Sequence, residues 1–406
     1  MASRPTLLFL SHCLPYPPHA GVLNRAFHLA RELARDWDIR MVACYRRNHH
    51  PDDAARAAAQ EGLRGIVAMA GDPVAISAEW STARRVWDHL RSVVRGRAYT
   101  WYEYRSPGFA RALHAALTAA PAPDLVHLES LDLHGYLDQL PPGVPVACTH
   151  HNIESELLRA RSGAVRSVLT ARYLRHQAGL VEAVERRLTP RLALNVVVSD
   201  ADAGRLHALA PEARVVVVPN GVDTDRLRPA PETEERDGRV VFVGPTYAFQ
   251  NRDAVDYLVS DIWPRVLAAR PGATLELVGR GPAADLDRYA RVPGVIVAGH
   301  VADLGAALAR AQCAVAPIRV GGGTRLKILD GWAAGRAVVS TAVGCEGLRA
   351  LDGENLLVRD RPEEFAEGVV RILTDAVLRR RLGRAARDTA ERFYGWPALG
   401  AGLRQA

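Results

Sequence analysis

The chain has 406 residues, 48% of them hydrophobic and 24% charged, and a formal net charge of +7. A chain of this length exceeds one ordinary compact core, so we expect two domains, and the composition excludes a largely disordered protein. The five cysteines lie far apart without Cys-x-x-Cys spacing, which excludes a disulfide framework and a cysteine zinc site and favours a reducing compartment. The apolar run Leu7–Leu10 is too short for a signal peptide or a membrane span, so a cytoplasmic protein is expected.

The N-terminal half alternates short apolar runs with helix-length segments. A loop rich in proline and glycine, Pro15 to Gly21, follows the first run, and apolar residues at helical spacing then continue to Leu33. Such alternation is typical of parallel strands that are buried on both faces. The predicted strands of this half are Leu7–Leu10, Ile39–Cys44, Gly65–Ala68, Asp124–Leu128, Val144–Cys148, Leu194–Val198 and Val215–Val218.

Residues 219–238 interrupt this pattern with prolines and charges, which predicts a linker. A second alternating series follows, and residues from Pro362 onward are predicted to be helical. Its predicted strands are Val240–Val243, Thr274–Val278, Val295–Ala298, Cys313–Ile318 and Ala337–Ser340, and its predicted helices lie near Ala254–Ala268, Asp303–Ala311 and Thr324–Ala334.

Two doubly wound α/β domains, residues 1–218 and 239–387, account for both series. A C-terminal helix of about residues 388–406 is expected to pack back on the first domain. Sheets of this class bind ligands beyond the carboxyl ends of their strands, so a cleft between the two domains is expected.

The segment around Lys327, the chain's only lysine, carries the clearest chemical signal. An apolar strand enters a loop formed by Gly321, Gly322 and Gly323, and Thr324 is placed to cap the following helix. Glycines allow close backbone approach, and a helix start with added positive charge from Arg325 and Lys327 suits a phosphate or diphosphate. The alternative is a tight turn without a ligand.

Asp330 follows Lys327 by three positions, so the two side chains can share one helix face. They can form a local ion pair. Alternatively, the carboxylate accepts hydrogen bonds from a sugar diol while the lysine binds phosphate, as a nucleotide-sugar site requires.

Several segments follow one another in a characteristic order: Pro15–Gly21 with Asn24 and Arg25, Thr149–Ser155, Val198–Asp202, Val218–Asp223, Phe242–Gly244 with Asn251, Gly299–Leu304, Gly321–Asp330 and Ser340–Leu348. Together they resemble the retaining glycosyltransferases of family 4, particularly the bacterial polysaccharide sugar-transferase branch. The resemblance covers nearly the whole chain and implies the GT-B architecture of two Rossmann-like domains facing each other across a cleft.

The resemblance implies transfer of a sugar from a nucleoside-diphosphate sugar, with retention of anomeric configuration, in polysaccharide, glycolipid or other glycoconjugate biosynthesis. Arg325 and Lys327 would neutralise the departing diphosphate, Asp330 would bind the ribose hydroxyls, and residues near Val301 would line the base. Basic side chains and helix dipoles would replace a metal ion, so neither a metal nor another cofactor is expected. Asp200-Ala201-Asp202 has the letters of a metal-binding D-x-D element but sits where the family has a core turn.

One position departs from the family pattern. Many members carry two glutamates eight positions apart, whereas here the second position is Asp330 and the first is Gly322. The shorter aspartate reaches less far, so the ribose contact would be looser or mediated by water, which puts donor affinity in doubt more than the fold.

The remaining candidate residues also follow the resemblance. His151 matches a histidine near the transferred sugar, with His150 as the alternative if the register differs by one; without the resemblance, a histidine hydrogen-bonded at a strand end is the default interpretation. The other predicted donor contacts are Gly21, Gly244 and Glu346, and the predicted acceptor-side residues are Asn24, Arg25 and His150.

Two stretches are rich in arginine: Arg84 to Arg111, which interleaves aromatic residues, and Arg159 to Arg191. Solvated helix faces are the commonest explanation for such stretches. Arg84 to Arg111 also suits peripheral contact with an anionic membrane, at the inner face, where a lipid-linked acceptor would be found. Nucleic-acid binding is not expected, because no known module accompanies the charge.

Two other functions stay open. One is a GT-B sugar-nucleotide epimerase, and the other is a non-catalytic subunit that binds nucleotide sugars. A dehydrogenase is disfavoured, because neither domain's first strand leads into a G-x-G-x-x-G motif. The base, the sugar and the acceptor are not predictable from these residues.

Overall fold

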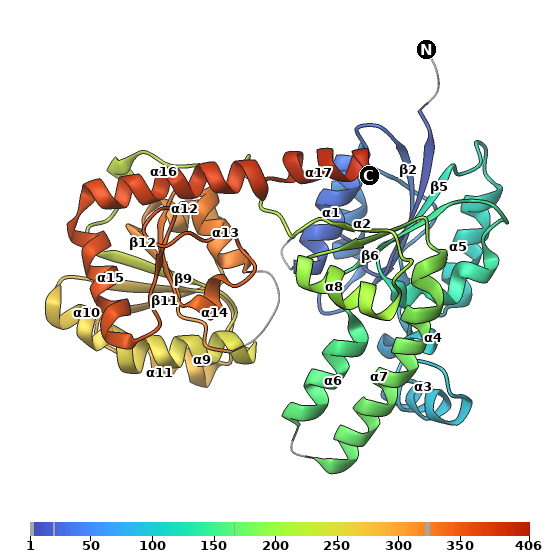
Figure 1. The fold of residues 1–406 in the computed structure, drawn as a ribbon, viewed down its shortest axis with the longest axis horizontal. Helices are drawn as coiled ribbons and strands as arrows, with labels where there is room; N and C mark the ends of the chain where they lie inside the picture. Colours follow the sequence, from blue (N-terminus) through green and yellow to red (C-terminus); the bar gives the residue numbers. More distant parts are fainter. Residues whose placement is uncertain (1–3, 19–20, 166, 321–324) are drawn as a thin grey trace. The chain divides into compact units, whose positions relative to one another are not determined.

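The computed structural model describes residues 4–18, 21–165, 167–320 and 325–406, so the predicted positions Gly321 to Thr324 lie outside the described residues. The chain forms two compact units: residues 1–219 with 400–406, and residues 220–399. Each unit is a parallel β-sheet with helices on its faces (Figure 1). This is the predicted α/β class with two doubly wound sheets.

Unit 1 contains a sheet in the order β3-β2-β1-β5-β6-β7-β8, with β4 paired to β2. Its strands are β1 Thr6–Ser11, β2 Asp38–Tyr45, β3 Ala68–Met69, β4 Val74–Ala75, β5 Leu125–Leu128, β6 Val146–His150, β7 Leu194–Val197 and β8 Val215–Val217. Its helices are α1 Gly21–Leu33, α2 Asp53–Leu63, α3 Thr82–Arg95, α4 Thr100–Glu103, α5 Pro107–Thr118, α6 Glu154–Ala164, α7 Val168–Leu188 and α8 Asp200–Leu209, with short 3₁₀ turns at Ser77–Glu79, Leu131–Gln139 and Thr189–Arg191.

Unit 2 contains a parallel sheet in the order β11-β10-β9-β12-β13-β14. Its strands are β9 Arg239–Val243, β10 Thr274–Val278, β11 Val295–Gly299, β12 Cys313–Ala316, β13 Ala337–Ser340 and β14 Leu357–Val358. Helix α9 Phe249–Tyr257 continues through a π-helical turn at Leu258–Ile262 into α10 Trp263–Ala269, and Glu232–Glu234 forms a 3₁₀ turn. The other helices are α11 Ala283–Ala290, α12 Leu304–Ala309, α13 Leu326–Ala333, α14 Ala342–Cys345, α15 Pro362–Thr374, α16 Ala376–Phe393 and the start of α17 Trp396–Gln405.

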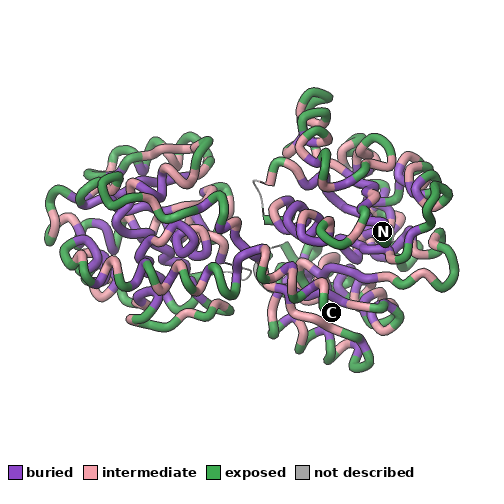
Figure 2. Tube along the Cα trace, turned by 90° about the horizontal axis from the view of Figure 1, so that it is seen from above, coloured by how far each residue is buried: buried purple, intermediate pink, exposed green. Residues whose placement is uncertain are grey.

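The strands are buried because helices cover the sheets, as the purple segments of each unit show (Figure 2). Leu7 to Leu10, for example, are fully buried in β1. Continuous apolar runs therefore predicted most strands. The sequence prediction missed β4 and β14, whose two residues each are too short for a recognisable run.

Residues 220–238, predicted as a linker, pack on unit 2. Val222 and Leu227 are buried there, and Glu235 pairs with Arg336 at 2.6 Å and with Arg379 at 3.3 Å. At the other end of the chain, residues 400–406 belong to unit 1, where Arg404 donates a hydrogen bond to the buried Glu32. Among the described helices, none combines the length and apolar character needed to cross a bilayer.

Candidate functional site

In unit 2, strands β9 and β12 are neighbours although two βα units separate them along the chain. The order of the sheet reverses at this pair, and ligands of doubly wound sheets bind beyond the strand ends at such a switch point. Helix α9 follows β9, and helix α13 follows β12. Side chains at the starts of these two helices are therefore brought together.

Lys327 and Asn251 meet at this point. The Lys327 Nζ atom donates a hydrogen bond to Asn251 Oδ1 at 2.7 Å, and it lies 5.2 Å from the centre of the Phe242 ring. Burial, and secondarily the charge of Arg325, lowers the pKa of Lys327 to about 8. The ammonium group is therefore held by a neutral amide and an aromatic face, an arrangement that favours acceptance of an anion.

Arg325 occupies the N-cap position of α13. The predicted helix beginning at Thr324 is thus shifted, with the first helical residue at Leu326. The Arg325 side chain is 7% exposed and lies 3.8 Å from the carboxylate of Glu346. Burial lowers its pKa, and Glu346 partly opposes this. Two basic groups therefore lie within the first turn, where the helix dipole also favours an anion.

Asp330 lies one turn after Lys327 on α13 and is half-buried. Burial raises the pKa of its carboxyl group to about 7, although the charges of Lys327 and Arg226 act in the opposite direction. Burial therefore favours the neutral form of this group, whose hydroxyl donates a hydrogen bond, over the carboxylate, which only accepts.

The other predicted donor residues of unit 2 lie on several elements. Gly244 directly follows β9 with a φ of +151°, and a Cβ atom there would lie 2.9 Å from Asn251 Nδ2. Val301 is half-buried against the core after β11. Glu346 follows α14 and its side chain is 75% exposed. Gly244 thus lies beside Asn251, and Glu346 lies beside Arg325.

In unit 1, three polar residues directly follow three neighbouring strands. His12 follows β1, Glu129 follows β5 and His151 follows β6, and the sheet order places these strands side by side. The carboxyl ends of parallel strands meet at one edge of a sheet, so the three side chains converge there.

Glu129 lies at the centre of this group. His127 Nε2 lies 3.1 Å from Glu129 Oε2, and His151 Nε2 lies 2.9 Å from the Glu129 backbone oxygen and 3.3 Å from Oε1. Burial opposes ionisation of Glu129, but the hydrogen bonds from both histidines hold its pKa well below the usual range. The ring of His12 lies 5.2 Å from that of His151, and burial lowers the pKa of His12 to about 3. Glu129 thus orients His151, through the hydrogen bond at its backbone oxygen and the nearby carboxylate.

The predicted acceptor-side residues differ in burial. His150 is buried, its Nε2 lies 2.9 Å from Asn195 Oδ1, and burial lowers its pKa to about 4. Arg25 is fully buried in α1 and donates a hydrogen bond to the backbone oxygen of Pro219. Asn24 is half-buried, and Gly21, predicted as a donor contact, is the exposed first residue of α1.

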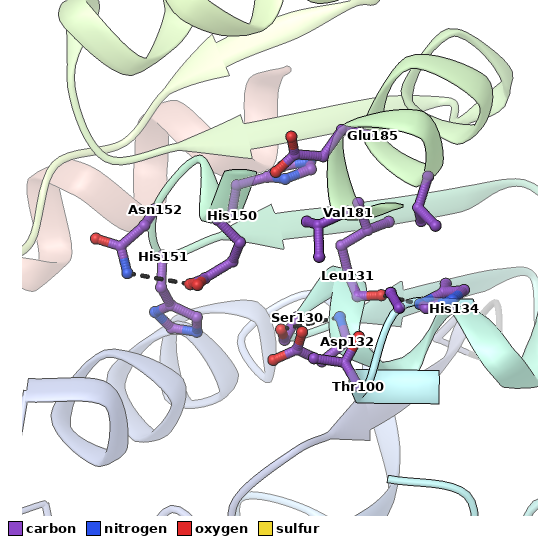
Figure 3. Close-up of a pocket in the computed structure, with 13 residues that line it drawn as sticks. Thr100, Ser130, Leu131, Asp132, His134, His150, His151, Asn152, Val181 and Glu185 are labelled. Carbon is purple, nitrogen blue, oxygen red and sulfur yellow. Dashed lines mark hydrogen bonds between the residues drawn. The ribbon is translucent and has the colours of Figure 1, made fainter. Parts of the chain in front are cut away.

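A small pocket of about 30 Å³ opens beside His151 (Figure 3). Its polar lining comes from the ends of β5 and β6, from the 3₁₀ turn that begins at Leu131 and from helices α4, α6 and α7. Asn152 donates a hydrogen bond to Glu154, and burial raises the pKa of the Asp132 carboxyl group to about 7. The lining residues are Ala98, Thr100, Ser130, Leu131, Asp132, His134, His150, His151, Asn152, Glu154, Val181, Val184 and Glu185.

Sequence reasoning did not assign roles to His12, Glu129 or Asp132. The available signal was a polar residue immediately after an apolar strand run, but the run alone does not give the strand order. Asp202, by contrast, has a structural place: Ser199 caps α8 and donates a hydrogen bond to its carboxylate at 2.6 Å. The D-x-D letters at this position therefore mark a helix start.

Comparison with protein families matched two models. The model described as "Glycosyltransferase Family 4" matches residues 20–226, just over half of the chain, and the model described as "Glycosyl transferases group 1" matches residues 237–375. A search of curated proteins returned no match.

Solved structures with the same fold cover both units. Sucrose-phosphate synthase from Thermosynechococcus elongatus is 17% identical, with a TM-score of 0.66 and coverage of 98% of each chain. WaaG, a glycosyltransferase involved in lipopolysaccharide biosynthesis, is 17% identical, with a TM-score of 0.65 and coverage of 98% of this chain and 99% of WaaG. Anabaena Alr3699/HepE, in complex with UDP and glucose, is 13% identical, with a TM-score of 0.64 and coverage of 99% of this chain and 98% of HepE. The chain belongs to the family described as Glycosyltransferase Family 4 and is a glycosyltransferase of the GT-B type.

Proposed function

We propose that this enzyme transfers a sugar from a nucleoside-diphosphate sugar to an acceptor hydroxyl with retention of anomeric configuration. The observation that carries the proposal is the ammonium group of Lys327, held by Asn251 at the switch point of unit 2, close to Arg325. A diphosphate gains negative charge as the glycosidic bond breaks, and two positioned cations stabilise that charge more in the transition state than in the ground state.

Each basic side chain has a distinct role in this proposal. Arg325 presents a planar guanidinium, which can bind two phosphate oxygens at once, whereas Lys327 acts as a point charge. Both are shielded from water, so their attraction to phosphate is stronger than at an exposed surface. With this charge supplied by the protein, we propose that the transfer needs no metal ion. Asp330 would bind the ribose hydroxyls.

His151 contributes from unit 1. Its bonds to Glu129 fix the ring, and we propose that it contacts the transferred sugar during turnover. The acceptor hydroxyl attacks from the face that the diphosphate leaves, and a diphosphate oxygen takes the hydroxyl proton. No protein nucleophile is required in this scheme, and the acceptor belongs to polysaccharide or glycolipid biosynthesis.

A thermal-shift screen with UDP, GDP, ADP and dTDP tests the donor class, because a ligand that binds the folded state raises its melting temperature. UDP is tested first, since the similarly folded HepE was solved with it. Incubation with the corresponding sugar nucleotides and EDTA then tests the chemistry. Release of nucleoside diphosphate supports transfer, an isomeric sugar nucleotide indicates an epimerase, and binding without any turnover indicates a non-catalytic subunit.

A further inference from the structure

Helix α3 of unit 1 presents its apolar side to solvent. Val86, Trp87, Leu90, Val93 and Val94 are all exposed, by between 46% and 81%. At 100° per residue these side chains fall on one continuous side of the helix. Helices on the surface of a globular protein normally turn that side toward the core, so α3 has the reverse orientation.

Polar contacts hold α3 in this orientation. The buried Asp88 accepts a hydrogen bond from Ser77 at 2.7 Å, and Arg84 donates to the same carboxylate. The buried Ser92 accepts a bond from Gln177 of α7 at 2.7 Å. If the helix rotated its apolar side inward, Asp88 and Ser92 would turn outward and the buried Ser77 and Gln177 would lose these partners, which favours the observed orientation.

The exposed charged side chains of α3 are all basic. Asp88 is the only acidic residue of α3, and it is buried. Arg85 and Arg95 are exposed, as is Arg97 just after the helix. Trp80, exposed before the helix, stacks under the guanidinium of Arg84. Tryptophan and arginine beside an apolar stripe suit the boundary between lipid headgroups and acyl chains.

A second exposed apolar group lies at the same end of unit 1, where α7 begins (Figure 1). Val168 and Leu169 are 71% and 80% exposed. Tyr173, one helical turn further along α7, bonds to His89 of α3 at 2.5 Å, so the start of α7 is adjacent to α3. Arg172 and Arg175 on the same turn are exposed.

We propose that the outer side of α3, with the start of α7, docks on an anionic lipid surface. This membrane-binding surface is smaller than the stretch Arg84 to Arg111 predicted from the sequence, because Tyr102 and Tyr104 are buried and cannot contact lipid. Lipid is favoured over a protein partner because α3 combines an exposed apolar stripe with flanking exposed arginines and has no exposed acidic residue, which matches an anionic bilayer. The proposal concerns binding alone and does not depend on the transfer reaction.

Flotation of the full chain with vesicles tests the proposal without nucleotide or acceptor. We expect binding to vesicles of phosphatidylcholine with phosphatidylglycerol and little binding to phosphatidylcholine alone. The double variant Trp87→Gln/Leu90→Gln should reduce the binding by about tenfold or more, because two large apolar side chains no longer insert. Arg85→Gln/Arg95→Gln should reduce binding to anionic vesicles and weaken its dependence on salt.

Val377→Gln, at an exposed valine of α16 in unit 2, is the matched control and should float like the unmodified chain. Unchanged melting temperatures would show that the α3 variants fold. Absence of flotation at moderate salt overturns the proposal, as does equal flotation of the Trp87/Leu90 variant or equal binding to uncharged vesicles. If the chain does not float but forms a dimer by light scattering, and the α3 variants dissociate that dimer, the exposed side of α3 binds a second copy of the chain instead.

Discussion

The Nζ atom of Lys327 lies 2.7 Å from Oδ1 of Asn251, and the two residues are 76 positions apart. Asn251 is itself fixed, because its Nδ2 atom donates to the backbone oxygen of Pro245 at 2.9 Å. The amide therefore aims the lysine without neutralising it. A carboxylate in the same place would satisfy the charge internally and leave less of it for a phosphate ligand.

Lys327→Ala should weaken binding of a nucleoside diphosphate, or slow sugar transfer, by about tenfold or more, because a shielded charge-assisted contact is lost. Isothermal titration with the diphosphate identified by thermal shift, together with initial-rate kinetics, measures both effects. Val377→Gln serves as the exposed control. Unchanged affinity and unchanged turnover would remove the assigned role of Lys327.

The affinity for a nucleoside diphosphate should fall as the pH rises through about 8, because the amine of Lys327 then loses its proton in the free protein. Above that pH, binding must also take up a proton, so the dissociation constant should rise by up to about tenfold per pH unit. Titration between about pH 6.5 and pH 9.5 measures this slope.

Asn251→Asp should shift the loss of nucleoside-diphosphate affinity to higher pH, since a carboxylate raises the pKa of the adjacent amine. Lys327→Arg should remove this pH dependence of the affinity, since a guanidinium stays protonated over the pH range of the titration. A slope that persists in Lys327→Arg would assign the proton to another group.

His151→Ala and His150→Ala should separate function from stability. His151 is oriented by Glu129 and lines the pocket, so its loss should lower turnover with little change in melting temperature. His150 lies in the core, and its removal leaves Asn195 Oδ1 without that partner, at an expected cost of about 1–3 kcal/mol of unfolding free energy.

Kinetics and thermal melts of both variants decide the assignment. Full turnover by His151→Ala would return that residue to a structural role. Unchanged stability of His150→Ala would show that its contact with Asn195 does not stabilise unit 1.

The unfolding free energy should fall as the pH is lowered from about 6.5 toward about 3. Burial lowers the pKa of His12 to about 3 and those of His134 and His150 to about 4, so these three side chains take up protons in the unfolded chain before they do so in the folded chain. Asp132 and Asp330, whose pKa values burial raises to about 7, act in the opposite direction and reduce the slope above about pH 4. Glu129 also lowers the unfolding free energy as the pH falls below its ordinary pKa, because the pKa of this carboxyl group is lower in the folded chain than in the unfolded chain. Urea denaturation at several pH values measures the slope. His12→Phe should make it shallower, and an identical slope would exclude His12 as a contributor.

Gly244→Ala should impair nucleotide binding while leaving the protein folded. The φ of +151° is unfavourable for a residue with a side chain, and the added Cβ would displace Asn251, 2.9 Å from it. A stability cost of about 1–3 kcal/mol is expected from the strain. Thermal melts and nucleotide titration measure the two effects, with Gly163→Ala, where a Cβ meets nothing within 4 Å, as the control. Unimpaired nucleotide binding by Gly244→Ala would show that Asn251 tolerates the added atom.

The α/β class and most strands could be predicted from the amino-acid sequence alone, because a strand buried on both faces must be apolar along its whole length. The sequence also singled out Lys327 and His151, through their position after predicted strands and through resemblance to a family. It did not show that Glu129 orients His151, nor that Asn251 holds Lys327. These pairings depend on which strands are neighbours.

The order of the strands is established in the folded protein, since hydrogen bonds between parallel strands join segments far apart in the chain. The fold placed β5 between β1 and β6, which gathers His12, Glu129 and His151, and it placed β9 beside β12. It also decided the orientation of α3, whose periodicity alone predicts an apolar side facing the core. Buried polar contacts of Asp88 and Ser92 reverse that orientation, and such contacts exist only once their partners are in place.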